Sequence, residues 1–401
     1  MIFILLSWLF APLWWSIAWV RKQLTPAPQR ILIIEAAGIG DVVCSTAVFR
    51  ALRAGYPSAR IELMVQPAVA DIISCDSSLD NIIVWSPRCW RGLTGRLALA
   101  RRIAGFDTMI CLNPGAPQLA ASCWAALPRR LTVLPGGRKR SYALLRPLMT
   151  AVSVHQNGTQ FVQTQLNLLK PLGIESRDCK KSLTIPPEIA HRVSALLPDA
   201  CLVGVAIGSG LGIKEIPEPV LRNVIAHVYT RPDTAVVLIG GDKEREKAAR
   251  LSAGFSGRGV LDLTGRLTLA ESAAVLEKLS LFIGVNTGMT HMADALNIPL
   301  ICLGGPSDLK EQGPTGEQAT LLQLSPSCAP CDRVFSSPRH CISGQRECIT
   351  GIGSDEVIHA ISNKMQGYPR KLSVSVKILD GIPLRGPASC ATAMTDPASG
   401  A

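Results

Sequence analysis

The sequence is poor in aromatic residues, which make up 5% of its 401 positions. Grooves for oligonucleotides and polysaccharides stack their ligands on aromatic rings, so this composition argues against both classes of protein. The chain also lacks a dense basic block, because its 41 Lys and Arg are scattered in short groups among 30 Asp and Glu. The formal charge of +11 therefore favours phosphate-bearing substrates or an acidic lipid surface, and nucleic acid is not an expected partner.

The 13 cysteines do not form a disulfide framework, because most of them stand singly in apolar or mixed stretches. Isolated cysteines of this kind behave as small hydrophobic residues and are typical of a reducing compartment. The exception is a C-terminal cluster with spacings of two, nine and six residues, formed by Cys328, Cys331, Cys341 and Cys348. Reduced structural thiols are the preferred interpretation; a structural zinc site and a disulfide or redox function are the alternatives.

Charge is absent from the first twenty residues, and Arg21 and Lys22 follow directly. Twenty helical residues rise about 30 Å, enough to cross the hydrocarbon core of a bilayer. We therefore expect residues 1–22 to form a membrane anchor helix. Its basic C-terminal flank predicts that the domains after it lie on the cytoplasmic side of the inner membrane. A cleavable signal peptide and, because of Pro12, a kinked helix lying in the interface are the alternatives.

Short apolar runs alternate with helical patterns along the rest of the chain, which predicts parallel, doubly wound α/β sheets. A polar, proline-rich stretch from Lys180 to Glu188 separates two such series. We predict domains at residues 30–182 and 186–365, followed by a flexible tail at 366–401. Two such domains leave a cleft between the carboxyl ends of their strands, where ligands of open α/β sheets bind. The runs that predict buried strands are 31–35, 60–65, 81–85, 108–112, 202–207, 235–239, 281–285 and 300–303.

The first strand runs into a glycine-containing turn that carries Gly38, Gly40 and Asp41. Dinucleotide-binding proteins have a third small residue in this turn, but position 43 is Val, so the match to their fingerprint is incomplete. The turn allows a ligand to approach the backbone closely and places a carboxylate at the start of a helix. Asp41 is therefore either a helix cap or a general base or ligand-binding group.

The second candidate site follows the strand at 281–285, where Asn286, Thr287 and Gly288 begin a helix that contains His291. Unpaired N–H groups and the positive end of the helix dipole make such a turn an anion site. The alternative is an ordinary capped helix with a buried, hydrogen-bonded histidine.

Further candidates occur after two strands of the same half. Ser209 and Lys214 lie in a glycine-rich turn, as phosphate-binding residues do, and Asp242 and Glu244 follow Gly240 and Gly241. An acidic group at this position of an α/β domain commonly binds a ribose hydroxyl. The glycine-containing turn at 304–307 is another place where a ligand could approach the backbone closely.

Taken in order, these motifs resemble glycosyltransferase family 9, the heptosyltransferases of lipopolysaccharide core assembly. The resemblance covers residues 30–362 and rests on the turn GIGDVV at 38–43, GVNTGMTHMADAL at 284–296 and the cysteine-rich ending. The Lys-x-x-Pro element at 214–217 and the Gly-Gly-Pro-Ser turn at 304–307 add to it.

The resemblance implies the GT-B fold, two Rossmann-like domains facing across a cleft, with acceptor on the N-terminal side and nucleotide sugar on the C-terminal side. It implies an inverting, metal-independent transfer of a heptose or hexose from a nucleotide-diphosphate sugar to a lipopolysaccharide or other surface-glycan acceptor. Asp41 would be the base, and ADP-heptose is the expected donor, with no required cofactor. The turn at Gly38 and Gly40 would face the acceptor. The expected donor-binding residues are Ser209, Lys214, Asp242, Glu244, Asn286, Thr287, Gly288 and His291.

The chain departs from the family pattern in three places. Asn286 stands where characterised heptosyltransferases often have Asp, Ile216 stands where an aromatic residue is common, and the N-terminal anchor is not part of the usual soluble pattern. These departures bear on the identity of the sugar more than on the fold. A binding protein without activity and a nucleotide-dependent oxidoreductase are the alternative functions.

Overall fold

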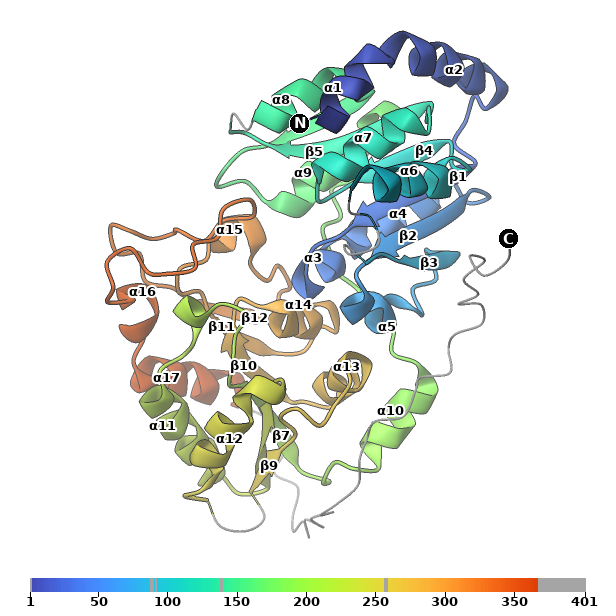
Figure 1. The fold of residues 1–401 in the computed structure, drawn as a ribbon. Coiled ribbons are helices and arrows are strands. Elements are labelled where there is room, and N and C mark those ends of the chain that lie inside the picture. Colours follow the sequence, from blue (N-terminus) through green and yellow to red (C-terminus); the bar gives the residue numbers. More distant parts are fainter. Residues whose placement is uncertain (1, 87–89, 91, 138–139, 256–258, 367–401) are drawn as a thin grey trace.

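The computed structural model describes residues 2–86, 90, 92–137, 140–255 and 259–366. Two α/β halves, each built on a six-stranded parallel sheet, face each other in Figure 1. The segment that joins them, from residue 175 to 186, has no regular secondary structure and overlaps the polar, proline-rich stretch from Lys180 to Glu188. Almost all of the tail predicted at 366–401 lies outside the described residues.

The first sheet has the strand order β3-β2-β1-β4-β5-β6. Its registers run from Arg30 opposite Arg60 to Glu35 opposite Val65, so the carboxyl ends of β1 and β2 lie at the same edge. The strands are β1 (Arg30–Glu35), β2 (Arg60–Val65), β3 (Asn81–Val84), β4 (Thr108–Cys111), β5 (Arg129–Pro135) and β6 (Ala151–His155).

The second sheet, in the order β12-β11-β10-β7-β8-β9, repeats the first sheet's topology when its strands are counted from β7. In both sheets the chain winds outward from its first strand and then crosses to the other side, which creates a switch point beside that strand. Ligands of doubly wound sheets bind at this point. The strands are β7 (Cys201–Ala206), β8 (Thr234–Ile239), β9 (Val260–Asp262), β10 (Leu281–Val285), β11 (Leu300–Leu303) and β12 (Ala319–Leu322).

Helices cover both faces of each sheet, because alternate residues of the buried strands point to opposite faces. The N-terminal half contains α3 (Ile39–Cys44), α4 (Thr46–Gly55), α5 (Ala70–Ile73), α6 (Gly92–Ile103), α7 (Ala116–Trp124), α8 (Arg140–Leu145) and α9 (Phe161–Asn167). The C-terminal half contains α10 (Pro187–Ser194), α11 (Glu218–Tyr229), α12 (Arg245–Ser252), α13 (Leu269–Glu277), α14 (Gly288–Ala295), α15 (Leu309–Gln312), α16 (Glu347–Thr350) and α17 (Ser354–Lys364).

The N-terminal apolar segment forms two helices, α1 (Ile2–Leu9) and α2 (Ala11–Leu24), where the sequence predicted one. Pro12 near the start of α2 leaves a break at Phe10, and the two axes are bent by 68°. Neither helix alone has the length and apolar content of a membrane span, whereas the bent pair together meets that test. Both helices pack on the outer side of the first sheet in Figure 1, next to α7 and α8.

Candidate functional site

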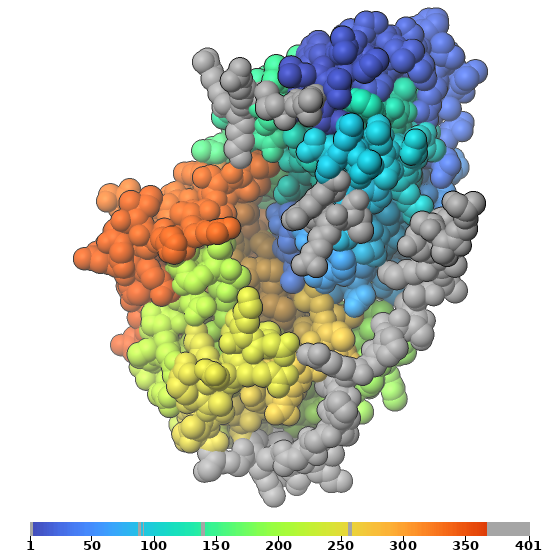
Figure 2. All heavy atoms as spheres, viewed as in Figure 1, coloured from blue at the N-terminus to red at the C-terminus, as the bar shows by residue number. Residues whose placement is uncertain are grey.

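A cavity of about 730 Å³ lies between the two halves, and its size is typical of a small-molecule site. Figure 2 shows the surface hollowed between the N-terminal half and the C-terminal half. Its lining comes from the turn after β1, the turns after β7 and β8, the start of α14 and the α15 region. The cavity therefore lies at the carboxyl edges of both sheets, where the sequence predicted the ligand cleft.

Asp41 lies in the first turn of α3 and lines this cavity. Its Oδ2 accepts a hydrogen bond from the Gly38 N–H at 3.1 Å, so it does cap the helix. One oxygen is sufficient for the cap, which leaves the other available to a ligand. The two interpretations left open by the sequence are therefore compatible in the structure.

Burial raises the pKa of Asp41 above its usual range, and the positive charge of Lys214 opposes this shift. Beneath it, the fully buried Glu35 has its pKa raised well above the ordinary value, first by burial and then by the negative charge of Asp41. Glu35 accepts hydrogen bonds from the Ala37 N–H at 3.2 Å and the Ser45 hydroxyl at 3.3 Å. Glu35 belongs to no motif in the sequence and was not predicted as part of the site.

The two glycine-containing motifs meet where α3 and α14 abut. A Cβ atom on Gly40 would lie 2.8 Å from Cδ2 of His291, and one on Gly288 would lie 2.7 Å from Cβ of Ile39. Both positions therefore require glycine for the helices to approach this closely. This contact gives Gly288 a packing role, while its contact with a donor phosphate stays a prediction.

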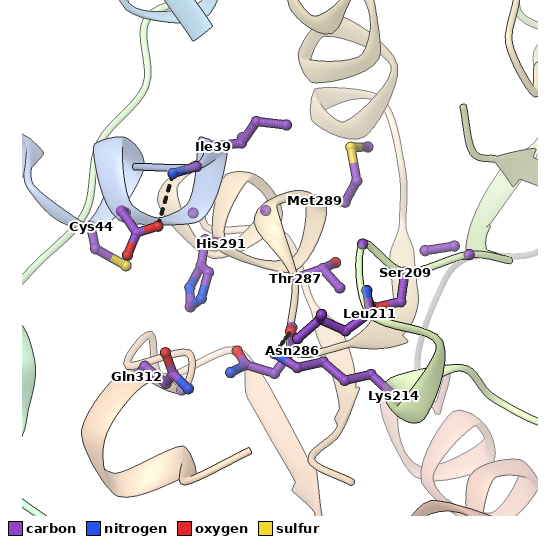
Figure 3. Close-up of a pocket in the computed structure, with 18 of the residues that line it drawn as sticks. Ile39, Cys44, Ser209, Leu211, Lys214, Asn286, Thr287, Met289, His291 and Gln312 are labelled. Atoms are coloured by element: carbon purple, nitrogen blue, oxygen red, sulfur yellow. Dashed lines mark hydrogen bonds between the residues drawn. The ribbon is translucent and has the colours of Figure 1, made fainter. Parts of the chain in front are cut away.

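Lys214 follows β7 and reaches across the switch point toward Asn286. Its Nζ lies 2.6 Å from Oδ2 of Asp332 and donates to the Asn286 carbonyl oxygen at 3.3 Å. Figure 3 shows Lys214 extending from its loop toward Asn286, with His291 and Thr287 nearby. The ammonium group is thus held in place at the cavity wall by a buried carboxylate that sequence reasoning missed.

Asn286 is the clearest sign that a ligand belongs here. Its side chain is buried, and Oδ1 has no hydrogen-bond partner among the described residues. A buried amide oxygen without a protein partner is costly, so such atoms in native proteins indicate where a ligand or water binds. Because Asn286 lines the cavity, a donor group of a bound ligand would satisfy it.

His291 is buried among charged groups and lines the cavity. Its Nδ1 lies 3.2 Å from Nζ of Lys181, which can only donate, so the neutral imidazole carries its proton on Nε2. The pKa of His291 is lowered well below its usual value, first by burial and then by Lys181 and Lys214. The ring is therefore a neutral hydrogen-bond donor at physiological pH.

Lys181 belongs to the interdomain linker and was not predicted as a residue of the site. In the structure it is buried and also donates to Oδ2 of Asp294 at 2.6 Å and to the Gly313 carbonyl oxygen at 3.2 Å. Asp294 accepts two further bonds from the Thr315 and Gly316 N–H groups. The linker is therefore fastened to α14 directly behind the candidate site.

Replacing Lys181 with Met should lower the free energy of unfolding by about 3–5 kcal/mol, because Asp294 would stay buried without its counter-charge. The additional change Asp294→Asn removes that charge and keeps an oxygen for one of the two backbone N–H groups. The double variant should regain much of the loss in chemical denaturation. A double variant as unstable as the sum of both single variants would show that the two residues are not coupled.

The remaining predicted donor residues fall into two groups. Ser209, Thr287 and Glu244 line the cavity with the residues above, and Glu244 also accepts a bond from the Gly241 N–H at 2.8 Å. Asp242 lies on the exposed side of the same turn, where Oδ1 pairs with Arg245 at 3.0 Å, and it is not among the lining residues. The ribose contact predicted for these two acidic residues stays a prediction.

The four C-terminal cysteines line one small cavity beside Ile213, so the fold brings the sequence cluster together. All four are free thiols in the structure. Burial raises the pKa of Cys331 and Cys348, and neighbouring thiols of the cluster add to this shift. In the described part of the chain, no group of three or more His, Cys, Asp or Glu side chains is arranged to hold a metal ion. The choice between thiols, zinc and redox function stays a prediction that metal analysis of purified protein can test.

Known proteins resemble this chain in sequence and in fold. Lipopolysaccharide heptosyltransferase 3 of Escherichia coli is 25% identical over 293 residues, covering 67% of this chain and 81% of the relative. A glycosyl transferase family 9 structure from Veillonella parvula superimposes with a TM-score of 0.70 at 21% identity, covering 85% of this chain and 98% of that one.

The E. coli ADP-heptose lipopolysaccharide heptosyltransferase II gives a TM-score of 0.67 at 17% identity, covering 84% of this chain and 99% of that one. A dodecameric iron-containing heptosyltransferase, solved with ADP-D-beta-D-heptose, gives a TM-score of 0.52 at 16% identity. The match covers 84% of this chain and 77% of that one. The family model for glycosyltransferase family 9 (heptosyltransferase) matches residues 125–340, more than half of the chain. The chain belongs to glycosyltransferase family 9 and is a glycosyltransferase.

Proposed function

We propose that this protein transfers a heptose from ADP-heptose to a lipopolysaccharide core or related glycolipid acceptor, with inversion at the anomeric carbon. The names of the relatives, which act on lipopolysaccharide or on ADP-heptose, support this choice of substrates. The observation that carries the reaction is the shared cavity, in which Asp41 from one half lies within electrostatic reach of Lys214 from the other.

The donor diphosphate would lie at the start of α14, where free N–H groups and the helix dipole favour negative charge. Lys214 adds a positive charge next to Asn286. The unpaired Asn286 Oδ1 would accept a hydrogen bond from a hydroxyl or amino group of the donor, and the His291 Nε2–H would donate one. A neutral Asn at position 286 adds no repulsion toward the diphosphate.

Asp41 would take the proton from the acceptor hydroxyl as that oxygen attacks the anomeric carbon. The new glycosidic bond forms while the bond from the anomeric carbon to the diphosphate oxygen breaks, and ADP leaves with the bonding electrons. Lys214 and the α14 N–H groups would stabilise the charge on the leaving phosphate. One displacement from the opposite face inverts the anomeric configuration. Metal independence stays a prediction, tested by measuring transfer after dialysis against EDTA with and without added divalent ions.

A thermal-shift screen should identify the nucleotide. Ligands that bind only the folded state stabilise it by about 2.7 kcal/mol at one hundred times their Kd. ADP and ADP-heptose should therefore raise the unfolding midpoint in a concentration-dependent way, and the GDP- and UDP-sugars should leave it unchanged. Stabilisation by a UDP- or GDP-sugar alone would contradict ADP-heptose as the donor and leave the fold assignment intact.

A further inference from the structure

The helix α2 has two apolar faces, and only one of them is covered by the protein. Ala11, Trp14 and Ala18 are buried, with the spacing of one helix face, against the first half. Trp14 lies 5.1 Å from Trp124 of α7 between ring centroids. An ordinary surface helix would be polar on its other side.

Several specific contacts hold the helix pair on the protein. Phe3 of α1 stacks on Trp124 at 4.8 Å, and the Trp8 Nε1–H donates to the Leu144 carbonyl oxygen at 2.9 Å. The Arg21 guanidinium donates to four carbonyl oxygens, those of Ala104, Phe106, Ala125 and Ala126. Four such bonds fix the C-terminal end of α2 in orientation as well as position, because the guanidinium is planar and rigid.

The opposite face of α2 carries an apolar stripe that we define as Leu13, Ile17, Val20 and Leu24. Their exposed fractions are 58%, 44%, 50% and 75%, and their spacing of four, three and four residues places them on one side of the helix. Other exposed apolar side chains of the helix pair are Leu5, Leu9, Phe10, Trp15 and Trp19. So many large exposed apolar side chains on one helix pair mark an interaction surface, unlike single scattered apolar residues.

The charges around the stripe fit an anionic lipid surface. No Asp or Glu precedes Glu35, so the helix pair itself is free of negative charge. Arg21 bonds to the Ala104 carbonyl oxygen, which places the exposed Arg101 and Arg102 of α6 near the end of α2. Exposed tryptophans and flanking cations are typical of helices at the membrane interface. A second copy of this chain would bring like charges together at the same place.

We infer that α1 and α2 lie in the plane of an anionic phospholipid surface, with the stripe immersed and the opposite face still packed on the first half. Figure 1 places the pair at the end of that half away from the C-terminal half, so the cavity between the halves stays accessible. This inference does not rest on the proposed sugar transfer, and it replaces a spanning anchor with an interfacial one.

Vesicle sedimentation with the full chain tests the inference. The wild type should bind vesicles of phosphatidylglycerol and phosphatidylethanolamine more tightly than vesicles of phosphatidylcholine alone. The triple change Leu13→Asn, Ile17→Asn and Leu24→Asn should weaken this binding by about 100-fold, because three apolar side chains no longer gain from immersion. Ile342→Asn, a change at an 80% exposed position of the C-terminal half, is the matched control and should bind as the wild type does.

Further measurements distinguish an interfacial helix pair from a membrane-spanning segment and from a dimer interface. Alkaline carbonate should release the bound protein from the vesicles, and retention after this extraction would show a spanning segment and overturn the inference. Equal vesicle binding by the triple variant and the wild type would also overturn it. So would a wild-type dimer that fails to bind vesicles and becomes monomeric in the triple variant.

Discussion

Asp41→Asn should lower kcat by about 10²- to 10⁴-fold, the usual contribution of a positioned general base. The amide keeps the shape of the side chain and an oxygen for the Gly38 N–H, so the helix cap survives while the base is lost. Donor affinity, measured by calorimetric titration with ADP, should change little, because Asp41 belongs to the half opposite the predicted donor site. The measurement is the rate of ADP release with saturating acceptor.

A matched control separates catalysis from capping. Glu356 caps α17 with the same arrangement, since its Oε2 accepts from the Gly353 N–H at 3.1 Å, and it is remote from the cavity between the halves. Glu356→Gln should therefore leave kcat unchanged. If Asp41→Asn turned over like Glu356→Gln, Asp41 would be only a cap.

The dependence of kcat/KM on pH is a second test of Asp41 as the base. Because burial raises the pKa of Asp41, the wild-type kcat/KM should fall with decreasing pH already above the usual range of an aspartate. Activity is lost as the pH drops through the raised pKa, since only the ionised form can accept a proton. The residual activity of Asp41→Asn should lack this acid limb.

Lys214→Met should weaken donor binding by about 10- to 100-fold, the loss expected for a hydrogen bond to a charged group. The change removes the positive charge and leaves the Asp332 carboxylate buried beside the predicted diphosphate, so repulsion adds to the lost attraction. Calorimetric titration with ADP measures the effect directly.

Lys247 provides a closely matched control. Its Nζ pairs with Glu215 at 3.2 Å and its side chain is 14% exposed, against 12% for Lys214, but it does not line the cavity. Lys247→Met should bind ADP as the wild type does. A Kd that rises equally in both variants would attribute the loss to general destabilisation, and an unchanged Kd in Lys214→Met would refute its contact with the donor.

The sequence predicted the fold well where strands are long and buried on both faces. The apolar runs at 31–35, 202–207 and 281–285 form the central strands β1, β7 and β10, and the motifs that follow these strands do converge. Short or polar strands were missed: β9 spans three half-buried residues, and β5 begins with two arginines. Periodicity cannot identify strands whose side chains are held by hydrogen bonds and partial burial.

Ion pairs between residues that are distant in the sequence could not be predicted either. Lys181 lies in a polar linker, so its composition indicated solvent, yet it is buried against Asp294, 113 residues away. Asp332 lies in the cysteine-rich segment and pairs with Lys214 because that segment packs on the turn after β11, where the Asp332 N–H donates to the Pro306 carbonyl oxygen. Such pairs depend on tertiary contacts, which a single sequence does not reveal. The predicted residues that line the cavity follow strands, whereas Lys181 and Asp332, which were missed, do not.

The most direct test of the account is sugar transfer itself. The full chain, in detergent or on vesicles, is incubated with ADP-heptose and lipopolysaccharide from a heptose-deficient strain, and the acceptor is examined by mass spectrometry and by NMR of the anomeric proton. The account predicts the addition of one heptose with inverted anomeric configuration by the wild type, and almost none by Asp41→Asn. Retained configuration, or equal transfer by both proteins, would contradict Asp41 as the base of a single displacement.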